Sequence, residues 1–355
     1  MAYNKTNWDE TTPRSLANLN NMENQYDEAV LYGIDLRKDN TKQLNLEVLS
    51  TLPTPGTAGR IFVYTVDEML YYDDGTVLKR LTKYSGTLVG WGYAAYGELD
   101  SSLFGGGYTA FGCGYYTSFA IKRDGSIVGY GNDENNEISN IPAGTVYKAV
   151  AGGEDHAVTL KTDGSLASWG ADTYNVVTDT PAGTDYIKIA AGRYFSVALR
   201  DDGSIVAWGR GGITEPPSTG VYVDIGASYR NGLAVEDDGS IVAWGTDYSN
   251  IVSNAPAGTG FVKVVGASRN DWATALKTDG SIVSWGEDGD GQVTDSPSGT
   301  GYIDIAAADR GGIAVDANNN LETWALGVSS LASEKPEGTA FYRVTAGRTH
   351  ALAMI

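Results

Sequence analysis

Short apolar segments recur along residues 85–355, and in each of them β-branched or other apolar residues alternate with small or polar ones. The clearest copy is DGSIVAWG at residues 202–209. Alternation of this kind, bounded by Gly and Asp, predicts β-strands. The other copies, strong ones first, occupy residues 124–131, 163–170, 238–245, 279–286, 85–92 and 319–325.

These copies are evenly spaced along the chain. One aromatic residue marks each copy: Trp91, Tyr130, Trp169, Trp208, Trp244, Trp285 and Trp324. Successive markers are 39, 39, 39, 36, 41 and 39 residues apart. A fixed period near 40 residues with strand-like units predicts a propeller or another repeat array.

Each repeat contains further predicted strands. In the clearest repeat, an apolar run at residues 186–192 is followed by SVALR at 196–200, an Asp-Gly pair and the marker strand. Asp-Gly between two such runs predicts a hairpin with a type I′ turn. The polar segment TDTPAGT at 178–184 suits a turn or an edge strand because of its Pro and Gly. The unit is therefore expected to be an antiparallel blade of three or four strands.

The number of copies indicates how the blades assemble. One blade of this size cannot bury its own apolar face, so the blades are expected to stack around an axis. The first marker strand, at 87–91, has no partner before it, and the last SVALR-like strand, at 351–355, ends the chain. We therefore expect an all-β, seven-bladed propeller whose two ends share one blade, which leaves no exposed edge.

The first 84 residues have a different pattern. Thr12 and Pro13 fit an N-cap and the first helical position, and apolar residues then follow at spacings of three and four. The proposed helix face includes Leu16, Leu19, Met22 and Tyr26. We expect an attachment segment with this amphipathic helix at 1–49, a linker and β-hairpin at 50–84 with turns at 66–68 and 74–75, and the propeller at 85–355.

Two resemblances follow from these motifs. The segment AGGEDHAVTLKTDGSLASWG at 151–170 and its relatives resemble the regulator of chromosome condensation repeat, and the short period is similar to the compact version in a bacterial β-lactamase inhibitor protein. The stretches TNWDETTPRSLANLNNME at 6–23 and GRIFVYT…LYYDDGT at 59–76 resemble the attachment end of bacteriophage tail proteins. The second resemblance implies a virion tail component made in the bacterial host cytoplasm and anchored to other tail or baseplate proteins. A homo-oligomer such as a trimer fits that setting.

Composition narrows the class of partner. The chain has 44 acidic and 25 basic residues, a formal net charge of −19, which disfavours nucleic acid. No apolar run reaches the ~20 residues of a membrane span, so we expect no membrane insertion. One cysteine, Cys113, excludes an intrachain disulfide, and two histidines, His156 and His350, give little support for a metal site. We expect no metal and no cofactor.

Comparison of the repeats with one another locates a candidate binding face. Strand and turn residues stay constant, whereas the loop before each SVALR-like strand varies, as does the loop after each marker. Strand direction places both variable sets at one end of the blades. The candidate binding residues are Tyr115, Tyr116, Asp155, His156, Tyr194, Phe195, Tyr229, Arg230, Asn270, Trp272, Arg310 and Arg348. Aromatic and Arg side chains are the types that form binding hot spots.

Two interpretations of Trp272 stay open: a ligand-contacting ring, or a cap on the core of its blade. The histidines are interpreted as structural loop residues, and no carboxylate pair is marked out for catalysis, so no enzyme activity is expected. The leading functional hypothesis is a tail protein whose propeller face binds a host-surface glycan or protein. The alternative is a protein-binding propeller, either an inhibitor or a structural tail component.

Overall fold

The computed structural model describes residues 47–49, 60–64, 69–73, 78–81, 86–213, 215–325, 330–338 and 340–355, the first four stretches by their backbone alone. The chain forms two compact units, residues 1–84 and 85–355. Helix-face residues Leu16, Leu19, Met22 and Tyr26 lie outside the described residues.

The first unit contains a four-stranded sheet in the order β1-β2-β3-β4. Its strands are β1 (Glu47–Leu49), β2 (Arg60–Tyr64), β3 (Met69–Asp73) and β4 (Leu78–Leu81). The antiparallel pairs β2–β3 and β3–β4 lie where the hairpin was expected. The parallel pairing of β1 with β2 was not expected, because three residues of strand give no alternation to recognise.

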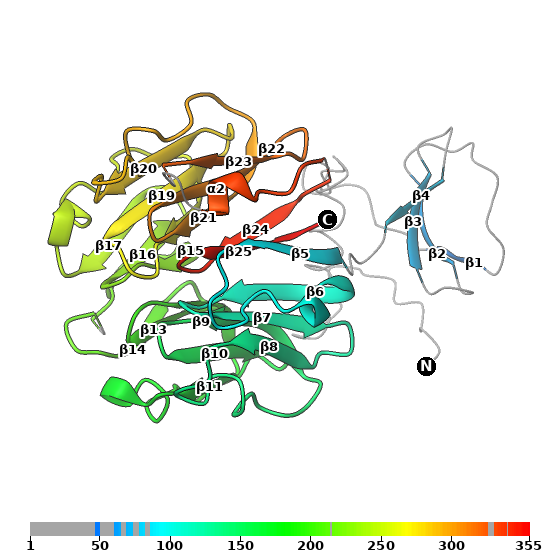
Figure 1. Ribbon diagram of the computed structural model, residues 1–355, viewed down its shortest axis with the longest axis horizontal. Helices are drawn as coiled ribbons and strands as arrows, with labels where there is room; N and C mark the ends of the chain where they lie inside the picture. The colour runs from blue at the N-terminus through cyan, green and yellow to red at the C-terminus, as the bar shows by residue number, and fades with distance from the viewer. Residues whose placement is uncertain are drawn as a thin grey trace, which may run out of the picture. The chain divides into compact units, whose positions relative to one another are not determined.

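The second unit consists of small antiparallel sheets that repeat along the chain (Figure 1). Five of them have three strands each. They are formed by β9 (Tyr147–Gly152), β10 (His156–Lys161) and β11 (Leu166–Gly170); β12 (Tyr186–Ala191), β13 (Phe195–Arg200) and β14 (Ile205–Gly209); β15 (Tyr222–Ala227), β16 (Asn231–Glu236) and β17 (Ile241–Gly245); β18 (Phe261–Gly266), β19 (Trp272–Lys277) and β20 (Ile282–Gly286); and β21 (Tyr302–Ala308), β22 (Gly311–Asp316) and β23 (Leu321–Trp324).

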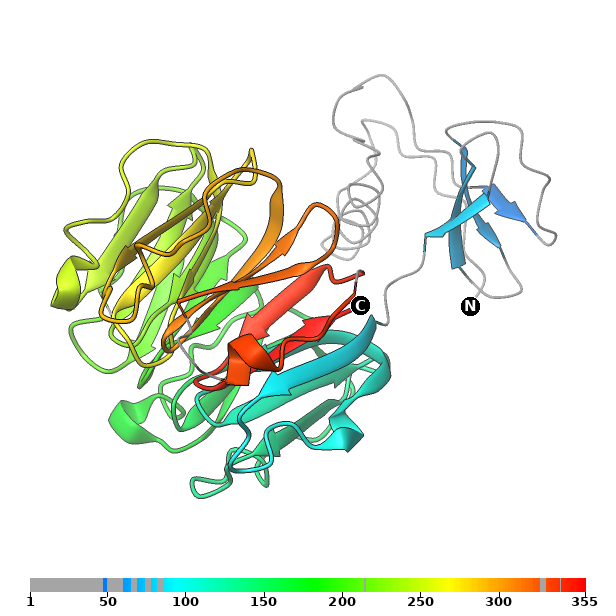
Figure 2. The ribbon, with the colours of Figure 1, turned by 45° about the horizontal axis from the view of Figure 1, so that its top comes forward.

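The sixth sheet joins strands from both ends of this unit, in the order β24-β25-β5-β6-β7-β8. Its strands are β5 (Gly86–Gly92), β6 (Gly105–Cys113), β7 (Thr117–Lys122), β8 (Ile127–Gly131), β24 (Arg343–Ala346) and β25 (His350–Met354). β25 pairs with β5 over five residues, whereas β5 meets β6 at only two positions. In Figure 2 the last strands, drawn in red, lie beside cyan β5.

Four short helical elements interrupt the strands in the described part of the second unit. They are the 3₁₀ turns η1 (Ser101–Leu103), η2 (Thr173–Asn175) and η3 (Tyr248–Asn250), and the helix α2 (Ser330–Ser333). Apart from α2, the expectation of an all-β architecture agrees with the described part of the second unit. The repeated three-stranded sheets are consistent with a β-propeller, and we call the first, second and third strands of a sheet inner, middle and outer.

The Asp-Gly turns connect the middle strand to the outer strand, but the expected type I′ turn is wrong. The Lys161 carbonyl accepts the Gly164 N–H, which places Thr162 and Asp163 at the centre of the turn. Only Gly164 has positive φ, at 84°, whereas a type I′ turn needs positive φ at both central residues. The Asp163 carboxylate accepts hydrogen bonds from the Ser165 N–H and hydroxyl, at 2.9 and 2.7 Å. This arrangement is a three-residue hairpin loop with Gly in the left-handed position.

The marker tryptophans fasten each outer strand to the connecting segment that precedes its sheet. Each is buried; five of them donate the indole N–H to a backbone carbonyl 31–34 residues earlier in the chain, and Trp91 donates to one 240 residues later. Trp208, for example, donates to Val176 O at 2.8 Å. The equivalent bonds are Trp169 to Glu137, Trp244 to Ile213, Trp285 to Ile251, Trp324 to Gln292 and Trp91 to Leu331. A buried indole needs such an acceptor, so these rings are scaffold.

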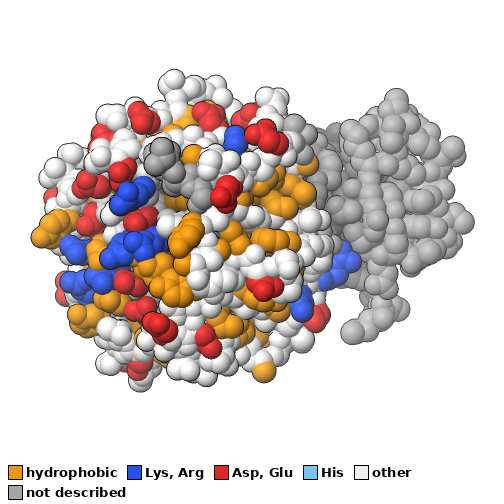
Figure 3. All heavy atoms as spheres, viewed as in Figure 1, with side chains coloured by type: hydrophobic (Ala, Val, Ile, Leu, Met, Phe, Trp, Pro, Cys, Tyr) orange, Lys and Arg blue, Asp and Glu red, His pale blue; other side chains and the backbone are white. Residues whose placement is uncertain are grey.

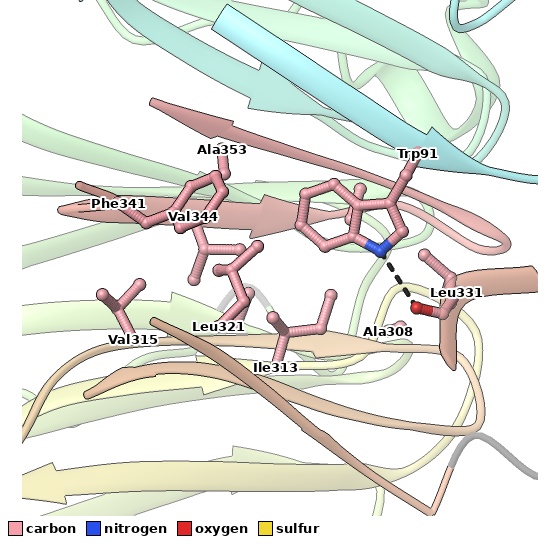
Figure 4. Close-up of a cluster of buried hydrophobic side chains, with 11 residues drawn as sticks. Trp91, Ala308, Ile313, Val315, Leu321, Leu331, Phe341, Val344 and Ala353 are labelled. Carbon is pink, nitrogen blue, oxygen red and sulfur yellow. Dashed lines mark hydrogen bonds between the residues drawn. The ribbon is translucent and has the colours of Figure 1, made fainter. Parts of the chain in front are cut away.

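The core is divided into clusters between neighbouring sheets. One cluster packs Trp91 and Val344 of the last sheet against Ile313 and Leu321 of β22 and β23, with Leu331 of α2 beside Trp91 (Figure 4). Another joins Val197 of β13 to Ile225 of β15. Because each sheet buries its faces against its neighbours, the stability of one sheet depends on the next.

Candidate functional site: the loop face

Both sets of variable loops lie at one end of the strands, which we call the loop face. The register places the first residue of a middle strand opposite the last residue of its outer strand, as with Phe195 and Gly209. The same middle strand starts beside the end of its inner strand, where Ala191 pairs with Ser196. The loops at 192–194 and after 209 therefore emerge together, while the Asp-Gly turns lie at the other end.

Backbone hydrogen bonds link the loops of neighbouring sheets. The Arg348 N–H donates to Tyr115 O at 3.3 Å, and the Tyr115 N–H donates to Gly153 O at 2.9 Å. The chain of bonds continues from Glu154 N–H to Arg193 O and from Arg193 N–H to Tyr229 O, at 3.3 and 3.4 Å. The loops thus form a connected surface that holds its side chains in fixed relation.

A row of stacked arginines and tyrosines crosses part of this face. Its members, which we call the Arg–Tyr row, are Arg210, Tyr174, Tyr194, Arg193, Tyr229, Arg230 and Tyr248. The Arg193 guanidinium lies 4.5 Å from the Tyr194 ring centre and 4.7 Å from that of Tyr229. Arg230 lies 4.7 Å from Tyr229 and 4.9 Å from Tyr248.

The other end of the row is formed by the loops after β11 and β14. The Tyr174 and Tyr194 ring centres are 5.7 Å apart, and the Arg210 guanidinium is 5.9 Å from Tyr174. Tyr174 and Tyr248 are 55% and 60% exposed, so the row presents ring surface to solvent. Stacking on aromatic rings is a property of guanidinium that lysine shares less well.

A second cluster joins loops of the six-stranded sheet to the loop before β19. Arg269 donates a hydrogen bond to the Tyr115 hydroxyl, and Arg348 donates one to the Tyr116 hydroxyl. Tyr116 also stacks against Tyr96, with ring centres 4.7 Å apart. Four of these residues come from loops of the six-stranded sheet, and only Arg269, from the loop before β19, belongs to another sheet.

Carboxylates lie among the arginines. Arg193 forms an ion pair with Glu154, and Arg348 lies 3.7 Å from Asp309. Burial raises the pKa of Asp271 to about 6, against the opposing effect of nearby Arg230. Among the described residues, no carboxylate lies within ion-pair distance (4.0 Å) of Arg210, Arg230 or Arg269. Figure 3 shows Lys and Arg side chains gathered at the left end of the strands, with hydrophobic and acidic side chains beside them.

Inside the ring, the inner strands line a cavity of about 240 Å³. Lys188 pairs with Asp224 of the next inner strand, and Asp224 also accepts the Val264 N–H at 2.8 Å. Lys263 of β18 and Asp304 of β21 form the same kind of ion pair between the next two inner strands. Since both carboxylates are used in joining neighbouring sheets, these charges serve the scaffold.

The structure separates the twelve candidate residues into three groups: eight at the loop face, Tyr115 buried beneath it, and three buried at the start of middle strands. Eight of them reach the loop face with partly or fully exposed side chains: Tyr116, Asp155, Tyr194, Tyr229, Arg230, Asn270, Arg310 and Arg348. Tyr115 is 3% exposed beneath Arg269 and Arg348. Asn270 is used in part by the scaffold, because its amide donates to Asp309 O at 2.7 Å.

The remaining candidates, His156, Phe195 and Trp272, are buried, which corrects their assignment to the binding face. Each is the first residue of a middle strand, and each is at most 2% exposed. Trp272 donates to Ala308 O at 3.1 Å and packs edge-on against Trp324. His156 is hydrogen-bonded to the Ser196 hydroxyl at 2.9 Å. Of the two interpretations of Trp272, the structure supports the core cap.

Sequence comparison missed three arginines of this face: Arg193, Arg210 and Arg269. Arg193 and Arg269 stand in the same variable loops as the candidates, and Arg210 follows a marker tryptophan. One feature of the sequence could have identified these arginines: the loops between inner and middle strands contain arginines and no lysine. Among the described residues, no group of three or more His, Cys, Asp or Glu could hold a metal ion. No helix in the described part of the chain is long and apolar enough to cross a membrane.

Comparisons with known proteins agree with this architecture. A model of the regulator of chromosome condensation (RCC1) repeat matches residues 186–212. No curated protein sequence matches the chain. Human WBSCR16 is a similar solved structure, with 14% identity, a TM-score of 0.62, and coverage of 75% of this chain and 99% of that chain.

Two further solved structures are also similar to this chain. Prp20p from Saccharomyces cerevisiae, described with its binding to Gsp1p and histones, has 14% identity and a TM-score of 0.58, and the match covers 77% of this chain and 92% of that one. The CRINKLY WD40 ectodomain of the Arabidopsis thaliana receptor kinase ACR4 has 18% identity and a TM-score of 0.55, and the match covers 67% of this chain and 87% of that one. At these identities the likeness concerns the fold alone. The second unit has an RCC1-like β-propeller fold.

Proposed function

We propose that this chain is a non-enzymatic binding protein of a bacteriophage tail, and that its loop face contacts a receptor on the bacterial surface. The observation that carries the proposal is the Arg–Tyr row on the loop face of a chain whose formal net charge is −19. Exposed tyrosine rings and arginines in a fixed arrangement supply contact area at low entropic cost.

The attachment half of the proposal is supported by the sequence of residues 6–23 and 59–76, which resembles the attachment end of phage tail proteins. In this proposal the first unit joins the chain to tail or baseplate proteins and the second carries the receptor site. Many copies on one particle would then raise the avidity of individually weak contacts.

We also propose that the ring has seven blades and that the two ends of the second unit close it. The six-stranded sheet would count as two blades, β24-β25-β5 and β6-β7-β8. The full pairing of β25 with β5 and the sparse contact of β5 with β6 support this division. Such closure removes free sheet edges.

Retention on bacterial envelopes tests the receptor-binding half. Purified full-length chain is incubated with envelope fractions from a panel of bacteria, and bound protein is measured after washing. We expect saturable retention on a restricted set of strains. Folded protein that is retained by none of them, including the strain on which the parent phage grows, contradicts the proposal.

The alternative is a protein-binding propeller, and the structure of Prp20p, studied with two protein partners, makes it worth separating. An inhibitor should act without residues 1–33, whereas a tail component should need them to enter the particle. Particles assembled with the truncated chain are therefore probed for its presence. Treating the envelopes with protease or with periodate before the retention assay shows whether the receptor is protein or glycan.

A further inference from the structure

The Arg–Tyr row has features that indicate its ligand. From Arg210 to Tyr248, single guanidinium groups are separated by one or two tyrosine rings, and these residues come from the loops that surround β12–β14 and β15–β17. The surface is therefore elongated and follows neighbouring sheets. An elongated row of rings and guanidinium groups fits an extended polymer better than it fits a compact small molecule.

The charge of the row is positive although the chain is acidic. Glu154 neutralises Arg193, but no described carboxylate is paired with Arg210 or Arg230. A guanidinium with unused donors is well suited to bind phosphate or carboxylate oxygens. Charge complementarity thus calls for an anionic ligand.

The neighbouring groups favour sugars over nucleic acid. Glu154, Asp155 and Asp271 lie beside the arginines, and carboxylates accept hydrogen bonds from hydroxyls but repel a densely charged backbone. A nucleic acid strand carries one charge per ~3.4 Å, whereas in this row the arginines are separated by tyrosine rings. The exposed rings of Tyr174 and Tyr248 offer stacking surfaces for sugar faces.

We infer that the Arg–Tyr row is a binding surface for a polyanionic glycan, a sugar polymer that carries phosphate or carboxylate groups along its length. Sugar faces stack on the tyrosines, while the anionic groups meet Arg210 and Arg230. The inference rests on the proposed function, because it names the chemical class of the receptor that the loop face contacts.

The test is a titration of the full-length chain with defined polymers. The probes are a polyuronate (an alginate oligomer), a poly(ribitol phosphate) bearing sugars, neutral dextran, and a single-stranded oligodeoxynucleotide of matched charge. We expect one of the two anionic glycans to bind, and its identity tells carboxylate from phosphate. Dextran and the oligonucleotide should not bind. The affinity should fall steeply when salt is raised to about 1 M, where the Debye length is about 3 Å.

Two variants with equal loss of charge locate the binding surface. Arg210→Gln with Arg230→Gln should weaken glycan binding on the order of tenfold or more, because charged hydrogen bonds are lost. Arg200→Gln with Arg343→Gln is the matched control: both residues lie at the opposite end of the strands, and Arg200 also stacks on a tyrosine. The control should bind as the parent chain does, and circular dichroism with thermal melting confirms that both variants are folded.

Three outcomes overturn the inference: neither anionic glycan binds, the oligonucleotide binds as well as the glycan, or both double variants lose affinity equally. Retention on envelopes is an independent readout. A chain that is retained on envelopes but ignores both glycans keeps the proposed function and loses this inference. A chain that binds a glycan but is retained on no envelope supports this inference and contradicts the proposed function.

Discussion

At the residue scale, one position of the repeat explains the misassigned candidates. The first residue of each middle strand, and of β7 and β25 in the six-stranded sheet, is buried whatever its chemistry; the position holds Thr117, His156, Phe195, Asn231, Trp272, Gly311 and His350. Polar and aromatic residues thus occupy one slot between the sheets. The sequence shows that the slot varies, but variation alone cannot tell a solvent-facing loop from the first residue of a strand.

Trp272 is therefore expected to matter for stability and not for binding. Trp272→Ala should lower the free energy of unfolding by about 3–5 kcal/mol, because a fully buried ring is removed and a cavity remains. Denaturant unfolding measures the loss. Below its melting temperature the variant should still be retained on envelopes, and a selective loss of retention by folded protein would restore Trp272 to the binding site.

The two histidines should make stability depend on pH. Burial lowers the pKa of His156 and of His350 to about 4, from an ordinary value of 6.5. The unfolded chain binds their protons first, so their contribution is complete above pH 6.5 and is lost as the pH falls toward 4. Asp271, with a raised pKa, acts in the opposite direction.

The measurement is the melting temperature of the parent chain and of a His156→Asn, His350→Asn variant across this pH range. Asparagine already occupies the equivalent slot at Asn231, so the substitution has a precedent within the chain. The decline from pH 6.5 to 4 should be shallower in the variant, while Asp271 contributes equally to both. Parallel curves would show that the histidines do not titrate in this way.

At the element scale, the strands and the positions of their turns follow from alternation and from Asp-Gly, whereas the turn type does not. Gly164 is left-handed but Asp163 is not, because the loop has three residues. The hydrogen bonds of the tryptophan indoles could not be predicted from the sequence either. Trp208 and its acceptor Val176 are 32 residues apart, and nothing in either segment indicates that they pair.

The turn glycines should be sensitive to substitution for two separable reasons. Gly164→Ala should cost about 3 kcal/mol, because a side chain is disfavoured at φ 84° and its Cβ would collide with the Thr184 carbonyl oxygen. Gly258→Ala is the control, since Gly258 has φ 96° with open space around it, and it should cost only about 1 kcal/mol. Equal losses on denaturant unfolding would mean that the collision is relieved by movement of the turn.

At the scale of the whole molecule, the repeat period indicates the propeller-like architecture and places the variable loops at one end. Repeat comparison could not show which loop residues touch. Arg193 and Tyr229 belong to different repeats, and their contact depends on the rotation between neighbouring sheets. The Arg–Tyr row is therefore a property of the assembled ring and cannot be read from any single repeat.

The central claim is that this end of the ring, and not the other, binds the receptor. The most direct measurement compares envelope retention of two double variants that each remove exposed side chains. Tyr174→Ala with Tyr248→Ala alters the loop face, and Val146→Ala with Val221→Ala alters the opposite end, where both valines are exposed beside inner strands. The account predicts at least about tenfold weaker retention for the tyrosine variant, from the loss of stacking, and unchanged retention for the valine variant. Unchanged retention of the tyrosine variant, or loss in the valine variant alone, would contradict it.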